Sequence, residues 1–274
     1  YGLVGDNGAG KSTLLKLLAG QSFPLEGEIR LFGEYTPRAL TQMRKNLGCV
    51  IERPGFFPGM TVEQTLKYYA IQKGVPRGRK VGEMMDLTGL GEKRKSRCGN
   101  LSLGQKQRLG LAIAMIGEPQ VLILDEPVNG LDPSGIVEFR NILHRLNTEK
   151  NITILLSSHI LAELQQIASV YGFLSRGVLV EEISAQELYD QCSSWVEMTV
   201  SDVEKYAAVL EHTFPEERFQ VMPEHVIRIH NPRRDIMAYS RLAAEHEIYI
   251  TSMQTLRNSL EDYYMELKKR GAGK

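Results

Sequence analysis

The feature that most constrains the fold of this chain is a glycine-rich stretch near its start, residues 5–13. It reads Gly-Asp-Asn-Gly-Ala-Gly-Lys-Ser-Thr, in which two glycines bracket four residues and Lys-Ser follows. This is the pattern of a phosphate-binding loop. Glycines there admit backbone conformations that side chains forbid, and they bring amide N–H groups close to an anion. A chance glycine-rich turn is the alternative, which is disfavoured because every position of the long motif is filled.

The stretch therefore predicts a site for nucleotide phosphates. The predicted nucleotide-binding residues are Asp6, Asn7, Gly8, Ala9, Gly10, Lys11, Ser12 and Thr13. Lys11 can contact the β- and γ-phosphates, and the Ser12 hydroxyl can bind Mg²⁺. Residues 11–20 are predicted to form a helix whose N-terminal amides and dipole face the phosphates.

Strand-like and helix-like segments alternate around this site. Apolar residues precede the loop, and further strands are predicted at residues 27–32, 47–51, 121–124 and 152–156, with a hairpin formed by 171–175 and 177–180. Helices are predicted at residues 133–146 and 160–168. This alternation favours a largely parallel sheet covered on both faces. Because only four residues precede Gly5, we expect the opening strands of the domain to be missing from the sequence.

Two further regions complete the predicted organisation. Residues from about 53 to 117 are mostly helix-like and form a helical lobe inserted into the α/β core. Beyond residue 193, strands at 196–200, 219–222, 226–230 and 248–251 combine with helices at 203–213, 235–246 and 256–269. The order βαββαβ followed by a helix favours a small ferredoxin-like unit. The predicted domains are therefore residues 1–192 and 193–274.

Composition excludes several classes of function. Lys plus Arg equals Asp plus Glu at 33 each, so a strong basic field for binding nucleic acid is absent. No apolar run approaches the roughly 20 residues that span a bilayer. The cysteines are Cys49, Cys98 and Cys192. Three widely spaced cysteines suit a reducing cytosol and form neither a disulfide framework nor a metal cluster.

A second chemical motif is a pair of carboxylates that follows a short apolar run. Residues 121–124 read Val-Leu-Ile-Leu and lead directly into Asp125 and Glu126. An α/β sheet places its ligands at the carboxyl ends of its strands. Asp125 is predicted to hold Mg²⁺, directly or through water, and Glu126 to polarise the water that attacks the γ-phosphate. Taken alone, the pair could be a solvated turn, but the phosphate loop favours the catalytic interpretation.

A third motif, residues 101–105, comes just before that acidic strand. Ser102 can cap the following helix, and Gly104 leaves backbone N–H groups exposed, which together form a phosphate-receptive helix N-terminus. In isolation the same residues describe an ordinary capped helix.

With these motifs in order, the chain resembles the ATP-binding subunit of an ATP-binding-cassette (ABC) transporter over about residues 1–191. The signature segment is then Leu101, Ser102, Leu103, Gly104 and Gln105, with Leu103 in place of the family's first glycine. Residues 129–132 match the D-loop, which ends at Asp132, and residues 157–159 match the switch segment, which ends at His159. The fold that the resemblance implies is a P-loop NTPase core of RecA type with an inserted helical subdomain.

The resemblance also implies a mechanism and partners. Two subunits, expected to be a homodimer, would hold ATP and Mg²⁺ between the phosphate loop of one copy and the signature helix of the other. Lys11, Glu126 and His159 would be the catalytic residues, and Asp132 would run along the dimer interface. The subunit would lie in the cytoplasm, bound to the inner face of the membrane only through transmembrane permease subunits, with no nucleic-acid partner.

One departure from the family pattern refines the expectation. Where most members carry glutamine after the strand at 47–51, this chain has Glu52. An ionised glutamate only accepts hydrogen bonds and adds negative charge beside the phosphates. Glu52, with the proline and aromatic residues that follow it, resembles subunits that export bacitracin-type and lantibiotic-type peptides. The alternatives are a cassette ATPase acting on ribosomes or DNA, and a nucleotide-dependent regulator without transport.

The residues after Glu52 allow two interpretations. Phe56, Phe57 and Met60 lie where the family docks the coupling helices of its membrane subunit, in the segment from residue 56 to about 69. They could equally pack inside the helical lobe, and the sequence favours neither possibility.

Overall fold

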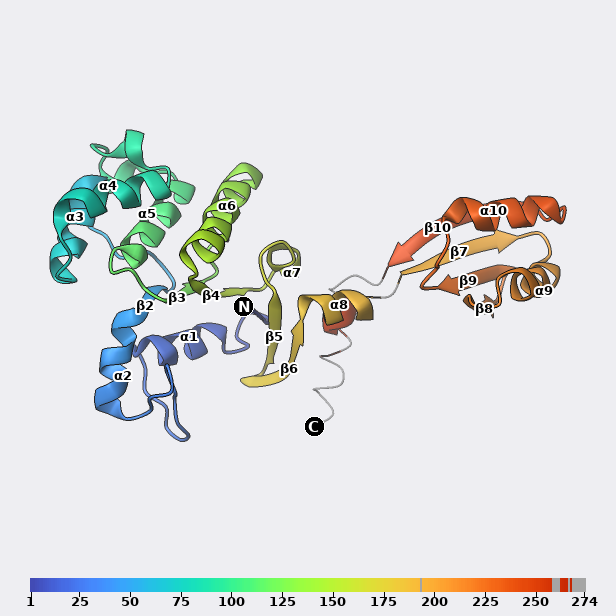
Figure 1. The fold of residues 1–274 in the computed structure, drawn as a ribbon, viewed down its shortest axis with the longest axis horizontal. Coiled ribbons are helices and arrows are strands. Elements are labelled where there is room, and N and C mark those ends of the chain that lie inside the picture. Colours follow the sequence, from blue (N-terminus) through green and yellow to red (C-terminus); the bar gives the residue numbers. More distant parts are fainter. Residues whose placement is uncertain (193, 258–261, 266, 268–274) are drawn as a thin grey trace. The chain divides into compact units, whose positions relative to one another are not determined.

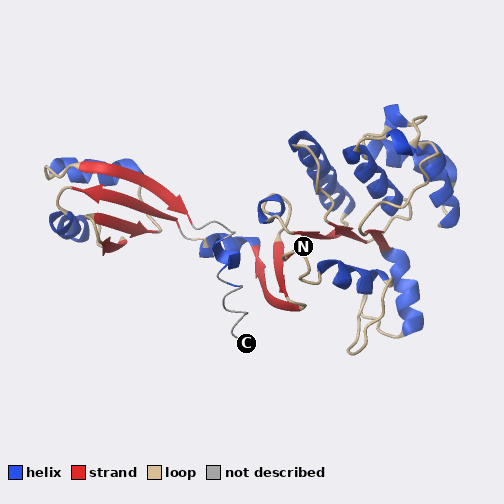
Figure 2. Ribbon diagram, turned by 180° about the vertical axis from the view of Figure 1, so that it is seen from behind, coloured by secondary structure: helices blue, strands red, loops and turns tan. Residues whose placement is uncertain are grey.

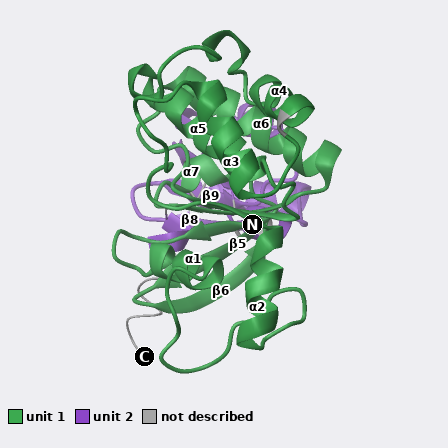
Figure 3. Cartoon of the chain, turned by 90° about the vertical axis from the view of Figure 1, so that its left-hand side faces the viewer, with its two compact units in different colours: residues 1–185 green, residues 186–274 purple. Residues whose placement is uncertain are grey.

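The fold is described from a computed structural model of residues 1–274, in which residues 193, 258–261, 266 and 268–274 are not described. The chain divides into two compact units, Tyr1–Ala185 and Gln186–Lys274 (Figure 3).

The first unit is built on a six-stranded sheet in the order β2-β3-β4-β1-β5-β6 (Figure 1). The strands are β1 (Gly2–Val4), β2 (Leu47–Val50), β3 (Val121–Asp125), β4 (Thr153–Ser158), β5 (Val170–Ser175) and β6 (Val178–Ser184). Strands β2, β3, β4, β1 and β5 are parallel, and β6 joins β5 as an antiparallel hairpin. The predicted, largely parallel sheet is confirmed.

Helices cover this sheet on both sides. The helices are α1 (Lys11–Ala19), α2 (Pro37–Met43), α3 (Val62–Gln72), α4 (Arg77–Leu87), α5 (Leu103–Met115), α6 (Pro133–Lys150) and α7 (Leu161–Leu164), with short 3₁₀ helices at Arg44–Asn46, Gly91–Lys93 and Cys98–Asn100. Helices α1 and α2 lie on one side of the central strands and α3 to α6 on the other (Figure 1). Helices α3, α4 and α5 contact one another and form the predicted helical lobe.

The strand order explains where the motifs meet. The phosphate loop follows β1, Asp125 ends β3 with Glu126 directly after it, and His159 follows β4, which lies between those two strands. Parallel strands end at the same edge of a sheet, so segments far apart in the sequence are brought together at one edge.

One predicted element in this unit is wrong, and another is longer in the prediction than in the structure. Residues 27–32 form no strand; the chain makes only an isolated bridge between Leu31 and Glu34. The two residues between them, Phe32 and Gly33, both have positive φ (53° and 85°), so the chain reverses in a tight turn instead of extending. The helix predicted at 160–168 is limited to Leu161–Leu164.

The second unit has the predicted ferredoxin-like order of elements, and Figure 2 distinguishes its helices from its strands by colour. After α8 (Ala185–Gln191), its elements are β7 (Ser194–Val200), α9 (Val203–Thr213), β8 (Arg218–Met222), β9 (Val226–His230), α10 (Ile236–Glu245) and β10 (Ile250–Arg257). The strands form one antiparallel sheet in the order β10-β7-β9-β8. The last strand includes Leu256 and Arg257, where the sequence predicted a helix. Residues 262–265 are helical, and residues 258–261, 266, 268 and 269 of the predicted range lie outside the described residues.

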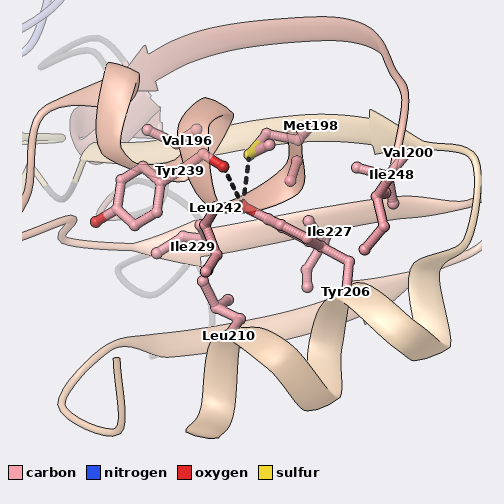
Figure 4. Packing of buried hydrophobic residues seen from close by; sticks show 11 residues of the cluster. Val196, Met198, Val200, Tyr206, Leu210, Ile227, Ile229, Tyr239, Leu242 and Ile248 are labelled. Atoms are coloured by element: carbon pink, nitrogen blue, oxygen red, sulfur yellow. Dashed lines mark hydrogen bonds between the residues drawn. The ribbon is translucent and has the colours of Figure 1, made fainter. Parts of the chain in front are cut away.

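The core of this unit lies between its sheet and its two long helices (Figure 4). Alternate residues of β7, namely Val196, Met198 and Val200, are buried against the helices. The fully buried Tyr206 of α9 donates a hydrogen bond from its hydroxyl to the backbone oxygen of Tyr239 on α10, at 2.9 Å. This bond satisfies a buried polar group and ties the two helices together.

A glycine in β2 supports a prediction about packing. A Cβ at Gly48 would lie 2.6 Å from the backbone oxygen of Ala114 on α5 and 2.8 Å from Leu122 Cδ2 on β3. We expect Gly48→Ala to destabilise the protein by about 1–3 kcal/mol through overpacking. Urea unfolding measures the effect.

The matched control is Gly82→Ala on α4, where an added Cβ meets nothing within 4 Å. This change should stabilise the helix by about 0.5–1 kcal/mol, because alanine has the higher helix propensity. A Gly48→Ala protein as stable as the wild type would contradict the close approach of α5 to β2.

Candidate functional site

The phosphate loop joins β1 to α1 through backbone conformations that require glycine. Gly8 and Gly10 have φ of 83° and 107°, in the region that L-residues rarely adopt. Gly10 is also the N-cap of α1, and no side chain caps this helix. A Cβ at Gly5 would lie 2.7 Å from the backbone oxygen of Leu174. The first turn of α1 therefore presents its amides at the loop, as an anion site requires.

Lys11 is the central cation of the site. Its side chain is buried, with 5% exposed. The ammonium donates to the backbone oxygens of Gly5 at 2.7 Å and Asp6 at 3.2 Å. The same Nζ lies 3.2 Å from Glu126 Oε1. Lys11 thus connects the phosphate loop to the acidic end of β3.

A buried serine fixes the acidic pair. Ser157 on β4 is fully buried and lies in register with Asp125 on β3. Its hydroxyl donates to Asp125 Oδ1 at 2.6 Å and accepts from the backbone N–H of Glu126 at 3.0 Å. Glu126 has a φ of 46°. One hydroxyl therefore orients the Asp125 carboxylate and the strained backbone that carries Glu126.

The Glu126 carboxylate is the point where three sequence motifs converge. Its Oε2 lies 2.5 Å from His159 Nδ1 and 3.4 Å from Asn129 Nδ2, which donates to it, while its Oε1 faces Lys11. The structure thus brings together the three predicted catalytic residues, Lys11, Glu126 and His159. A carboxylate positioned by a histidine and an amide can accept a proton from a water molecule.

Glu52 lies at the end of the neighbouring strand β2. It has a φ of 63°, and its Oε1 lies 2.5 Å from Lys16 Nζ on α1. The hydrogen bond and the positive charge of Lys16 lower the pKa of Glu52, so the carboxylate is ionised at neutral pH.

The signature segment begins α5 with a capping box. The Ser102 hydroxyl accepts from the Gln105 backbone N–H at 3.3 Å, and Gln105 Oε1 accepts from the Ser102 backbone N–H at 3.1 Å. Leu103 is 48% exposed. Ser102, Leu103 and Gly104 line an open cleft together with Gly130, Leu131 and Asp132 of the D-loop. A hydrogen bond from Ser134 lowers the pKa of Asp132.

Sequence reasoning missed three residues of this arrangement. It placed Ser157 only within the switch segment, and it gave no role to the side chains of Asn129 and Lys16. Ser157 and Lys16 each contact a carboxylate of a distant segment, so no local pattern carries the signal, whereas Asn129 lies only three residues from Glu126. Only the register of β3 with β4 would have shown that Ser157 faces Asp125.

A phosphate loop at the N-terminus of a helix, next to an acidic strand end, defines the class of P-loop NTPases. The family described as "ABC transporter" matches residues 1–129. The bacitracin transport ATP-binding protein BcrA of Bacillus licheniformis is 36% identical over 97% of this chain and 87% of its own length, and BcrA of Enterococcus faecalis is 38% identical over 97% and 86%. The lantibiotic transport ATP-binding protein SrtF of Streptococcus pyogenes is 39% identical over 66% of this chain and 77% of its own.

A solved structure agrees with this assignment. CbiO1 of Clostridium perfringens, part of the ABC transporter complex CbiONQ, superposes with a TM-score of 0.63 at 26% identity and covers 78% of this chain and 84% of its own. The chain therefore belongs to the family of ABC transporter ATP-binding proteins, which are ATPases. No helix among the described residues has the length and apolar character to cross a membrane.

The buried serine gives a test of the site. Ser157→Ala removes the hydroxyl that holds both Asp125 and the Glu126 backbone, so we expect the ATPase kcat to fall at least tenfold. The stability cost should be about 1–3 kcal/mol, because two buried polar groups lose a partner.

The control is Ser158→Ala, the next residue on β4. Its hydroxyl bonds to the Ile160 backbone N–H and to Glu163 instead. The Ser158→Ala protein should lose a comparable free energy of unfolding, but its ATPase kcat should fall much less. Equal loss of kcat in both variants would contradict a specific role for Ser157.

Proposed function

We propose that this chain hydrolyses ATP to power the export of a peptide antibiotic of the bacitracin or lantibiotic type through a separate membrane permease. The observation that carries the ATPase site is the convergence of Lys11, Glu126 and His159 at one sheet edge. The names of the relatives that align over nearly the whole chain support the substrate class. An ATPase acting on ribosomes or DNA is not favoured, since the net charge is zero.

Each residue then has a role in hydrolysis. The backbone amides of residues 6–13 enclose the phosphates, and Lys11 exchanges its contact with Glu126 for the β- and γ-phosphates. Glu126 polarises the attacking water, and His159 contacts the γ-phosphate while it orients Glu126. The contacts at 3.2 Å and 2.5 Å support this assignment, because they put both partners beside one carboxylate.

The residues at the site also fit Mg²⁺. Ser12, directly after Lys11, offers a hydroxyl, and Asp125 offers a carboxylate that Ser157 already orients. Magnesium prefers oxygen ligands and is usually held by one or two carboxylates together with substrate phosphates and water. Ser12 and Asp125 would therefore hold the ion, which neutralises charge on the phosphates when bound.

The second ATP-binding surface would come from another copy of the chain. The capped N-terminus of α5, with Ser102 and Gly104 beside the D-loop, forms an open cleft. In a head-to-tail homodimer this cleft would receive the nucleotide of the partner, with Asp132 at the interface. The position of this cleft at the N-terminus of α5 supports the proposal, since a helix N-terminus attracts phosphate.

The permease would dock on the helical lobe, at the cytoplasmic face of the membrane. Phe57 is 52% exposed, and its ring meets that of Tyr68 edge to face, with centroids 5.7 Å apart. Phe56 and Met60 are half-buried beside it. An exposed aromatic cluster supports the interface interpretation of these residues over packing inside the lobe.

The role of Glu126 can be tested directly. Glu126→Gln keeps the shape of the side chain but removes the base, so steady-state ATP hydrolysis should fall by at least a hundredfold while ATP still binds. ATP-bound dimers should then accumulate, as size-exclusion chromatography with light scattering would show. Unchanged hydrolysis would exclude Glu126 as the base.

The proposed substrate class is tested in the source organism. Replacing the chromosomal copy with the Glu126→Gln variant should lower the minimal inhibitory concentration of bacitracin or of a lantibiotic by at least fourfold, because export stops. An antibiotic that acts inside the cell serves as the control and should show no change. If resistance to both peptide classes is unaltered, the proposed substrate class is wrong, even if the chain is an ATPase.

A further inference from the structure

Two lysines of α1 each pair with a glutamate at the end of a different strand. Lys11 Nζ lies 3.2 Å from Glu126 Oε1 after β3, and Lys16 Nζ lies 2.5 Å from Glu52 Oε1 after β2. The two lysines are five residues apart, which is about 7.5 Å along a helix axis. Lys11 belongs to the phosphate loop, whereas nothing in the motif accounts for Lys16.

Glu52 and Glu126 occupy equivalent positions on neighbouring strands. Val50 of β2 lies in register with Leu124 of β3, and each glutamate follows two residues later. Both have positive φ, 63° for Glu52 and 46° for Glu126. Adjacent strands are about 4.8 Å apart, so both carboxylates lie at the edge of the sheet that carries the phosphate loop.

This arrangement creates an electrostatic problem. ATP brings several negative charges to an edge that already holds Asp125, Glu126 and Glu52. A glutamine at position 52 would add none, whereas the Glu52 carboxylate repels the phosphates unless a cation offsets it. Lys16 supplies that cation.

Stability does not account for the pair. Lys16 and Glu52 have side-chain exposures of 33% and 64%. Exposed ion pairs of this kind contribute little to folding, because solvent screens them and two long side chains must be ordered. The effect of the Lys16–Glu52 pair should therefore appear in the affinity for an anion bound nearby and not in the free energy of unfolding.

We propose that Lys16 is a positioning residue for Glu52. Lys16 holds the Glu52 carboxylate against α1 and cancels the charge of that carboxylate at the triphosphate site. This inference rests on the proposed function, namely that residues 5–13 bind ATP. It accounts for a glutamate being tolerated where the family usually has glutamine.

The test is a double-mutant cycle on nucleotide affinity. A fluorescent ATP analogue is titrated into wild type, Lys16→Met, Glu52→Gln and the double variant, with Mg²⁺ and again with a chelator. Lys16→Met should weaken binding roughly fivefold, with a smaller effect in high salt because exposed charges are screened. Glu52→Gln should stay within about twofold of wild type. The double variant should recover to within about twofold as well, because the unpaired carboxylate is gone.

Two further variants make the outcome decisive. Lys80→Met breaks another lysine–glutamate pair, with Glu118, and should leave the affinity unchanged. Lys11→Ala should abolish tight binding. Binding that survives Lys11→Ala overturns the proposed site and this inference with it. If Lys11→Ala abolishes binding but Lys16→Met has no effect, or its effect persists fully in the double variant, only the role of Lys16 is overturned. Thermal melting of each variant confirms that it is folded.

Discussion

The buried ammonium group of Lys11 is the contact on which the site depends. A buried charge is tolerated only when it is fully paired and hydrogen-bonded, and Lys11 satisfies this through Gly5, Asp6 and Glu126. The two backbone contacts hold the loop around the lysine, and the carboxylate contact ties that loop to β3. The left-handed glycines, the uncapped start of α1 and the strand order all serve this one arrangement.

Around that cation, the site uses polar groups of very different exposure. Ser157 and Asp125 are buried and face each other between two strands, so their geometry is fixed by the sheet. Glu126 and His159 are partly exposed, at 21% and 31%, and are held by side chains from three segments. The buried pair, Ser157 and Asp125, suits the binding of a metal-phosphate group. The partly exposed pair, Glu126 and His159, leaves access for water.

The sequence predicted those features that are local. The phosphate loop and the helix cap at Ser102 each lie within one short segment, and the structure confirms that Ser102 caps α5. Contacts across segments were out of reach, because they depend on β4 lying between β3 and β1 and on the register of those strands. The strand predicted at 27–32 failed because its residues pair with no strand of the described chain, and Leu31 only bridges to Glu34 across a tight turn at Phe32 and Gly33.

The conformation of the two strand-end glutamates carries a cost for the fold. Left-handed backbone at a residue other than glycine is destabilising by of order 1–3 kcal/mol and persists where its surroundings enforce it. Glu52 and Glu126 both bear this strain, on adjacent strands. A chain selected for thermal stability alone would carry glycine or asparagine at both positions. Replacing Glu126 to relieve this strain would remove the proposed base, which limits how far this position can be stabilised without loss of turnover.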